Sequence, residues 1–171
     1  IMLSAIISDT LLFRSPTCTE KDERTAKELG KLAEIDDIHK YGMEMLIAGT
    51  SFDNNTPPEI LNLDKKEFNM GGTSMAVAQV NTVDVEGLLK MKSDFEKAMN
   101  DEINSKGYDL FLFVITDIIN SNSTLLAYGE KINLVELAFN KSLVNNEMLL
   151  KGVVSRKKQI LPFLMAATQS L

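Results

Sequence analysis

The chain has 171 residues, of which 44% are apolar and 25% are charged, a composition typical of a soluble globular protein with one large domain or two small ones. The 18 Lys and Arg residues are outnumbered by 24 Asp and Glu residues, so the net charge is −6. This balance excludes a global basic field for nucleic acid or an anionic membrane, and any anion site must therefore be local. No run of about 18 uninterrupted apolar residues occurs, so we expect no membrane span.

The single cysteine and the first residues of the sequence indicate the cellular compartment. Cys18 is the only cysteine, which excludes an internal disulfide and is typical of the reducing cytoplasm. The apolar opening is interrupted by Asp9, and neither a basic segment before it nor a cleavage pattern after it indicates a signal peptide. Because the sequence begins at Ile1, inside an apolar segment and without an initiator Met, we expect a piece of a longer protein.

Residues 1–50 have the periodicity of helices. The apolar opening predicts a short buried helix. Thr17 and Glu20 have the spacing of a capping box, which predicts a second helix over residues 20–35. A third helix is expected to end at Gly49.

A change of pattern follows these helices. The segment FDNNTPP, residues 52–58, is rich in turn-forming residues and is the best candidate for a linker. We therefore expect two parts, residues 1–50 and residues 59–171, joined by a linker over residues 51–58.

Beyond the linker, apolar residues alternate as in strands. Two alternating runs flank Gly71 and Gly72, which predicts a β-hairpin. Residues 83–107 predict one long amphipathic helix. Residues 108–117, YDLFLFVITD, are continuously apolar, so we expect a central strand covered on both faces. Shorter elements are expected further on: strands over residues 124–129 and 149–154 and helices over residues 135–139 and 162–169. Strands and helices alternate, so the predicted fold class is α/β, a mixed β-sheet with flanking helices.

Three consecutive cations, Arg156, Lys157 and Lys158, follow Ser155 where a predicted strand leads into the last helix. Ser155 is a good N-cap residue, but cations near a helix N-terminus are unfavourable by about 0.3 to 1 kcal/mol each. Pro162 is tolerated in a first helical turn, so the regular helix is expected to begin at or after Lys158. Open α/β sheets bind ligands outside the carboxyl ends of strands, which favours a phosphate-like anion here. A solvated basic turn is the alternative.

Asp9 is a second unusual position, because an ionisable group between the apolar runs SAIIS and TLLF would be expensive to bury unpaired. One interpretation is a capping or hydrogen-bonded carboxylate at a helix break, served by Ser8 and Thr10. The other is a metal ligand. The residues alone leave both open.

Several segments carry a resemblance to a known family. They are LSAIISDTLLFRSPTCTEKD at residues 3–22, LDKKEF at 63–68, VAQVNTVD at 77–84, YDLFLFVITDIINSNS at 108–123 and LLKGVVSRKKQILP at 149–162. With these motifs, the chain resembles the manganese-dependent, family II inorganic pyrophosphatases of the DHH superfamily over essentially its whole length. The resemblance implies a C-terminal portion, in which residues 1–50 are the helical tail of the N-terminal DHH domain and residues 59–171 are the DHH-associated substrate-binding domain.

The resemblance also implies roles for single residues. Asp9 matches a metal-ligand aspartate of the DHH domain. Arg156 and Lys157 match the substrate-binding pair of the SRKKQ motif, and Lys66 in LDKKEF matches a further substrate-binding lysine. These three cations are expected to converge on one concave surface. No residue is assigned as catalytic.

Cofactors and partners follow from the same resemblance. The full-length enzyme is expected to hold Mn²⁺ or Co²⁺, with Mg²⁺ accompanying pyrophosphate, and to be a cytoplasmic homodimer that binds neither nucleic acid nor membrane. The only histidine, His39, is expected on the surface. Asp9 alone cannot hold a metal ion tightly, so we expect the 171-residue chain to lack tightly bound metal and not to hydrolyse pyrophosphate without the missing DHH domain.

The alternative function is a non-catalytic module that binds polyphosphate or nucleotide, or an exopolyphosphatase-type domain, since related exopolyphosphatases share the second domain. A nucleic-acid function is not expected, because the chain has no Trp and only 6% aromatic residues. The resemblance agrees, since the nucleic-acid branch of the superfamily ends with a glycine-rich segment containing a histidine, and His39 is not in such a segment.

Overall fold

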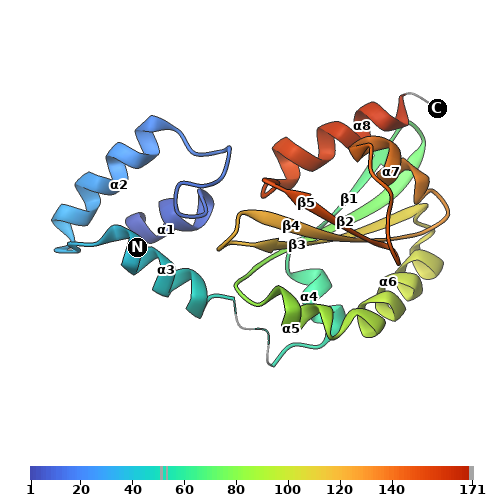
Figure 1. Ribbon diagram of the computed structural model, residues 1–171, viewed down its shortest axis with the longest axis horizontal. Coiled ribbons are helices and arrows are strands. Elements are labelled where there is room, and N and C mark those ends of the chain that lie inside the picture. The colour runs from blue at the N-terminus through green and yellow to red at the C-terminus, as the bar shows by residue number, and fades with distance from the viewer. Residues whose placement is uncertain (51, 53, 170–171) are drawn as a thin grey trace. The chain divides into compact units, whose positions relative to one another are not determined.

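The computed structural model describes residues 1–50, 52 and 54–169 (Figure 1). The chain divides into two compact units, Ile1–Ser51 and Phe52–Leu171. The division falls where the predicted linker begins, although residues 51 and 53 of that segment lie outside the described residues. The assignment of the two units to DHH and DHH-associated domains stays a prediction.

The first unit is helical, as predicted. It contains α1 (Met2–Asp9), α2 (Glu20–Leu32) and α3 (Ile38–Ala48), and α3 ends just before Gly49. Helix α3 lies close to the loop after α1 at Gly42, where a Cβ atom would lie 2.4 Å from the Leu12 side chain.

The start of α2 differs from the prediction. The capping box is formed by Thr19 and Asp22, so the predicted pair of Thr17 and Glu20 is wrong. The hydroxyl of Thr17 instead donates to the carbonyl of Asp9 and hydrogen-bonds with Ser15. Thr17 therefore belongs to the loop that follows α1.

That loop has an unusual backbone. Leu11, Leu12 and Phe13 have consecutive positive φ values of 47°, 54° and 66°. Residues other than glycine adopt this left-handed region at a cost of order 1–3 kcal/mol each, so neighbouring contacts must offset it. Leu11 and Leu12 are buried, and the hydroxyl of Thr10 donates to the carbonyl of Ile6 and accepts from the amide of Phe13. Burial and this hydrogen-bonded threonine hold the turn immediately after Asp9.

The second unit is built on a five-stranded sheet within the described residues. Its strands, in spatial order, are β1 (Lys65–Met70), β2 (Thr73–Thr82), β3 (Leu110–Asp117), β4 (Asn122–Tyr128) and β5 (Glu147–Lys151). β2 and β3 are parallel, whereas the other neighbouring strands are antiparallel. The mixed sheet confirms the predicted fold class, and the predicted central strand is β3.

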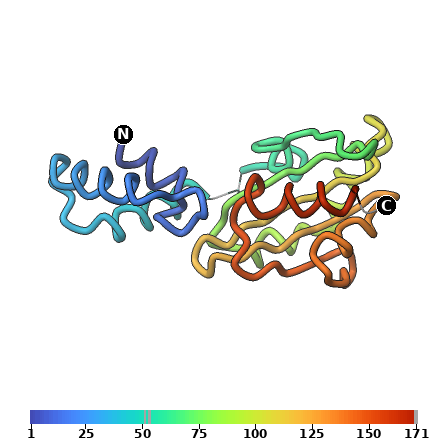
Figure 2. Tube along the Cα trace, turned by 90° about the horizontal axis from the view of Figure 1, so that it is seen from above, coloured from blue at the N-terminus to red at the C-terminus, as the bar shows by residue number. Residues whose placement is uncertain are grey.

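Helices cover both faces of this sheet, as Figures 1 and 2 show. One face packs against α4 (Pro57–Leu63), α5 (Val85–Leu89) and α6 (Lys92–Lys106). The other packs against α7 (Asn133–Phe139) and α8 (Leu161–Thr168). Because side chains alternate along a strand, β3 contributes Phe111 and Phe113 to the first layer and Leu112 and Val114 to the second. No described helix combines the length and apolarity needed to cross a membrane.

The β1–β2 connection confirms the predicted hairpin. Gly71 and Gly72 have φ values of 55° and 76°, and Met70 pairs with Thr73 across the turn. A two-residue turn with both φ values positive matches the twist of the flanking strands and favours glycine.

Several predicted elements have different bounds. The single long helix over residues 83–107 is wrong, because α5 and α6 are separate. The carboxylate of Asp84 accepts from the amide of Gly87 and caps α5, which ends at Leu89. The last strand ends at Lys151, because Gly152 turns with a φ of 70° and donates its amide to the side chain of Asn122.

A cluster of charges fixes β1 at the sheet edge. Lys65 forms an ion pair with Glu102 of α6, and Lys106 forms ion pairs with Glu102 and Glu67. The hydroxyl of Tyr108 donates to the carboxylate of Glu67, and this bond lowers the pKa of Glu67, aided by the nearby Lys106. A lowered pKa in the folded state stabilises the fold above the unfolded pKa of about 4.3, and this stabilisation is lost as the pH falls through the folded value.

Replacing Tyr108→Phe should therefore weaken the pH dependence of stability. Without the phenolic hydrogen bond, the folded pKa of Glu67 rises toward its ordinary value, so stability between pH 7 and pH 3 should fall by less than in the wild type. Urea unfolding at both pH values measures the difference. Tyr41→Phe is the matched control, since the hydroxyl of Tyr41 hydrogen-bonds with the hydroxyl of Ser4. Equal losses in Tyr108→Phe and the wild type would contradict the prediction.

Candidate functional site

The SRKKQ segment forms a wide turn between β5 and α8. Arg156–Ile160 is a single π-helical turn, η1, and the regular helix α8 begins at Leu161. The hydroxyl of Ser155 accepts from the amide of Lys158, so Ser155 caps the turn as predicted. Pro162 lies in the first turn of α8, where its missing N–H has no intrahelical partner to lose. The regular helix therefore begins after Lys158, as the sequence predicted.

The side chain of Gln159 hydrogen-bonds to the backbone at the start of this turn. Its Oε1 atom accepts from the backbone amides of Val154 and Ser155, at 3.0 and 3.1 Å, and its Nε2 atom donates to the carbonyl of Gly152 at 2.8 Å. One amide side chain thus satisfies three backbone groups that no helix or strand pairs. The last residue of the SRKKQ motif has a structural reason to be an amide.

Polar side chains attach the turn to the sheet. Gln79 of β2 donates to the hydroxyl of Thr116 at 2.9 Å and to the carbonyl of Val154 at 3.1 Å. Thr116 contacts the hydroxyl of Ser123 at 3.0 Å, and Ser123 donates to the carbonyl of Val153 at 2.7 Å. Gln79 and Thr116 lie near the carboxyl ends of the parallel strands β2 and β3. Open α/β sheets bind ligands just outside the carboxyl ends of their strands.

Arg156 is buried at the start of η1. Its side chain is only 8% exposed, and its Nη1 atom donates to the carbonyls of Asp64 and Val77, at 2.7 and 3.0 Å. Its Nη2 atom donates to the carboxylate of Asp64 at 2.8 Å. These charge-assisted bonds compensate the desolvation of the guanidinium group, which would otherwise be unfavourable.

The sheet register relates Lys66 to Arg156. Lys66 pairs directly with Val77, whose carbonyl accepts from Arg156. By strand alternation Lys66 shares a face with Phe68 and Met70, which pack into the same layer as α8. Lys66 and Arg156 therefore lie on one face of the sheet.

Lys157 follows Arg156 in η1 and is exposed, as is Lys66. The described structure thus brings the three cations predicted for substrate binding into one region. Their common binding role stays a prediction.

Asp9 lies in the first unit, at the end of α1, and is exposed. The Thr10 hydroxyl donates to the carbonyl of Ile6 and accepts from the amide of Phe13, so it is not the donor that the hydrogen-bonded interpretation of Asp9 called for. His39 is exposed, as predicted. The described residues contain no group of three or more His, Cys, Asp and Glu side chains that could hold a metal ion. Asp9 could therefore be one ligand, but the described part of this chain does not fit a complete manganese site.

Two residues of this region were missed by sequence reasoning. Asp64 lies within the LDKKEF motif, but its partner is 92 positions away in the sequence. Gln79 interrupts the apolar run of β2, and an amide at such a position is the only local signal of a buried polar contact.

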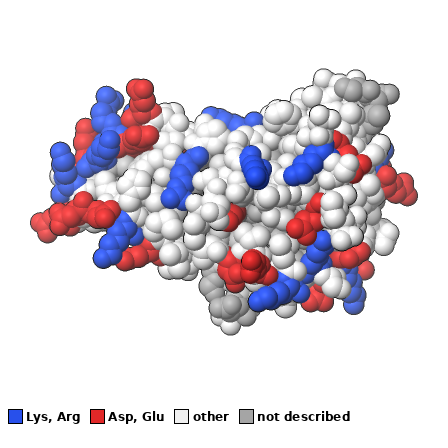
Figure 3. Space-filling view, in the orientation of Figure 1, with Lys and Arg blue, Asp and Glu red and all other residues white. Residues whose placement is uncertain are grey.

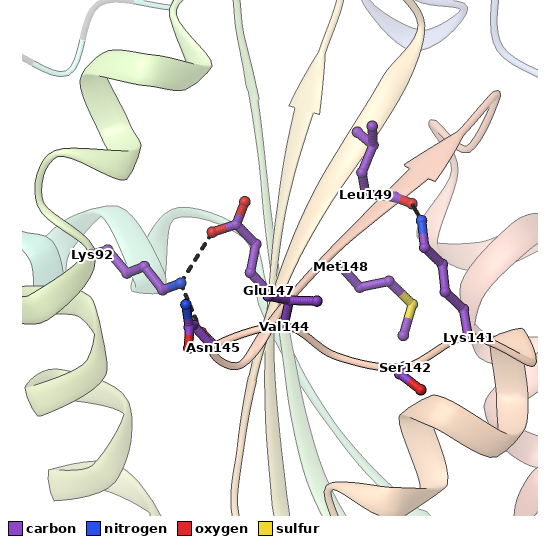
Figure 4. Close-up of a pocket in the computed structure, with 8 residues that line it drawn as sticks. All are labelled: Lys92, Lys141, Ser142, Val144, Asn145, Glu147, Met148 and Leu149. Atoms are coloured by element: carbon purple, nitrogen blue, oxygen red, sulfur yellow. Dashed lines mark hydrogen bonds and ion pairs between the residues drawn. The ribbon is translucent and has the colours of Figure 1, made fainter.

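A separate hollow of about 300 Å³ lies at the other edge of the sheet, beside β5 (Figure 4). The amine of Lys92 donates to the carbonyl of Asn145 and the carboxylate of Glu147, and the amine of Lys141 donates to the carbonyl of Leu149. Both lysines are thus engaged by the protein itself, and Lys141 covers a carbonyl of the edge strand. On the face of each unit in Figure 3, cations and anions are interspersed.

The comparisons with known proteins agree with the motifs. A family model described as "DHHA2 domain" matches residues 43–167. The chain is 51% identical over 170 residues to proteins of Bacillus cereus (strain AH187) and Bacillus anthracis named "Probable manganese-dependent inorganic pyrophosphatase", covering 99% of this chain and 55% of each relative. A crystal structure described as that of a "Methanococcus jannaschii putative family II inorganic pyrophosphatase" matches with a TM-score of 0.89 and 42% identity, over 98% of this chain and 54% of that chain.

These matches confirm the resemblance predicted from the motifs. The chain spans about half the length of the relatives it matches.

Replacing Gln159→Ala should loosen the turn that carries the cations. The amides of Val154 and Ser155 would lose their acceptor, so their hydrogen exchange should accelerate about tenfold, since one hydrogen bond contributes about 1 kcal/mol or slightly more. Exchange measured by NMR reports on each amide separately. Gln169→Ala, at the exposed end of α8, is the control. Unchanged exchange at Val154 and Ser155 would show that the turn is held without the Gln159 side chain.

Proposed function

Because the chain belongs to the DHHA2 domain family, we propose that it is the substrate-binding part of a manganese-dependent inorganic pyrophosphatase, which converts diphosphate and water to two phosphates. The observation that carries this proposal is the sheet register at Val77. It is the residue opposite Lys66, and its carbonyl accepts from Arg156, so cations from two distant segments lie on one face.

The chemistry of diphosphate suits this arrangement. Diphosphate is compact and carries several negative charges, so it needs cations that approach from different directions. Arginine offers a planar fork of donors to phosphate oxygens, and lysine offers a compact positive charge. We propose Arg156, Lys157 and Lys66 as the groups that bind the substrate. Positive charges held in place before the reaction also stabilise the charge that develops on a phosphoryl group.

A complete manganese site requires ligands beyond those that the described residues of this chain supply. The Bacillus relatives are named as manganese-dependent, and the described residues of this chain supply at most Asp9 toward such a site. We propose that the remaining ligands belong to a DHH domain of the longer protein, that Mn²⁺ or Co²⁺ binds there, and that Mg²⁺ accompanies the substrate. On the resemblance alone, we further propose a homodimeric and cytoplasmic parent protein.

The 171-residue chain by itself should not hydrolyse pyrophosphate. One carboxylate binds a transition metal weakly, so no activated water is expected. Phosphate release in the presence of added Mn²⁺ measures this directly. Turnover above that of a metal-only blank would contradict the prediction.

Lys66→Ala and Lys157→Ala should each weaken pyrophosphate binding to the chain. Losing one charge-assisted interaction of about 1.4 kcal/mol raises the dissociation constant about tenfold. Calorimetric titration measures this. Lys97→Ala is the control, because Lys97 is exposed on α6, which covers the opposite face of the sheet. Wild-type affinity in Lys66→Ala would contradict the assignment, and a clear preference of the chain for ATP over pyrophosphate would favour the nucleotide-binding alternative.

A further inference from the structure

The donors of Arg156 are used unevenly. A guanidinium group has five N–H donors in one plane. Among the described residues, Nη1 donates to the two carbonyls of Asp64 and Val77, and Nη2 donates once, to the carboxylate of Asp64. The N–H of Nε and the second N–H of Nη2 have no such partner within residues 1–50, 52 and 54–169. These two donors lie on the same side of the group and form the fork with which arginine binds two oxygens of an oxyanion.

We infer that Asp64 is a positioning residue for Arg156. The carboxylate and the carbonyl of Asp64 accept from Nη2 and Nη1. The N–H of Nε and the second N–H of Nη2 then remain available to bind two oxygens of a phosphate group. This inference rests on the proposed function and adds to it the residue that orients the arginine.

Asp64 has the properties of an anchor. Its carbonyl also accepts from the backbone amide of Gln79 at 3.1 Å, so its own position is tied to β2. It lies two residues before Lys66, and the same short segment therefore holds both the lysine and the arginine partner. The Asp64 side chain is 53% exposed, whereas that of Arg156 is 8% exposed. The carboxylate can thus be changed with little effect on the core.

If Asp64 acted by its charge alone, its removal would have the opposite effect on anion binding. A carboxylate 2.8 Å from the guanidinium group reduces the attraction of Arg156 for an anion. If Asp64 acted only by charge, removing it would tighten anion binding. If it orients the guanidinium group, removing it weakens anion binding, because the arginine must be ordered each time the anion binds.

The first experiment is a titration of the wild-type chain, Asp64→Ala and Asp64→Asn with inorganic pyrophosphate. Asp64→Ala should bind about tenfold more weakly, since it removes one charge-assisted hydrogen bond that orders the arginine. Asp64→Asn keeps an oxygen acceptor and should return to within about threefold of the wild type. Asp101→Ala, which removes an exposed carboxylate on α6, should not weaken binding. Equal or tighter binding by Asp64→Ala would overturn the inference.

The second experiment needs no ligand. The mobility of the Nε–H bond of Arg156, whose signal is assigned by its loss in Arg156→Lys, should be greater in Asp64→Ala than in the wild type, so its ¹⁵N order parameter should fall, because the guanidinium group loses its bond to the carboxylate. An unchanged order parameter would overturn the inference even if binding weakened. If the wild-type chain binds no pyrophosphate, the proposed function fails, and the order parameter alone then decides whether Asp64 orders the guanidinium group. Backbone amide spectra outside residues 60–70 verify that the variants stay folded.

Discussion

The buried guanidinium group of Arg156 is the constraint on which the second unit's candidate site depends. A cation removed from water must have its charge and its donors satisfied, and here the partners are the carboxylate and carbonyl of Asp64 and the carbonyl of Val77. These partners come from the end of α4 and from β2, whereas Arg156 begins η1. The pair therefore joins the last segment of the chain to the first hairpin of the sheet, and it brings the neighbourhood of Lys66 to the SRKKQ turn.

A second set of bonds gives the turn its place on the sheet. Backbone carbonyls at Val153 and Val154 would be unpaired after β5 ends, and they accept from Ser123 and Gln79 instead. Because the two donors belong to strands β4 and β2 of the sheet, the turn is held near the carboxyl ends of β2 and β3. Gln159 satisfies the amides on the other side of the turn. The exposed Lys157 therefore extends from a backbone that is fixed at both ends, which is the condition for a preorganised binding group.

Sequence patterns correctly predicted the elements that depend on local backbone preferences or on burial. The Gly71-Gly72 turn, the continuously apolar β3 and the late start of α8 after Lys158 all follow from backbone preferences or from burial on two faces, and they are found in the structure. The long helix over residues 83–107 was wrong because helical periodicity does not reveal that Asp84 caps one short helix before a second begins. The capping box at Thr17 was wrong because Thr19 with Asp22 offers the same chemistry two residues later. The bond between Asp64 and Arg156 could not be predicted, since only the folded sheet brings the two segments together.

The π-turn and the bond between Asp64 and Arg156 together explain why three cations are tolerated just before a helix. The argument from the helix dipole treats residues 156–158 as the first turn of a regular helix, where positive charge is unfavourable. The structure places them instead in a π-turn that precedes α8, so the dipole of the regular helix begins at Leu161. The charge of Arg156, moreover, is compensated inside the protein by Asp64. The position of Arg156 is therefore stable without a bound anion, and it is the arrangement of its donors, rather than an unfavourable placement of the cations, that supports the proposed phosphate ligand.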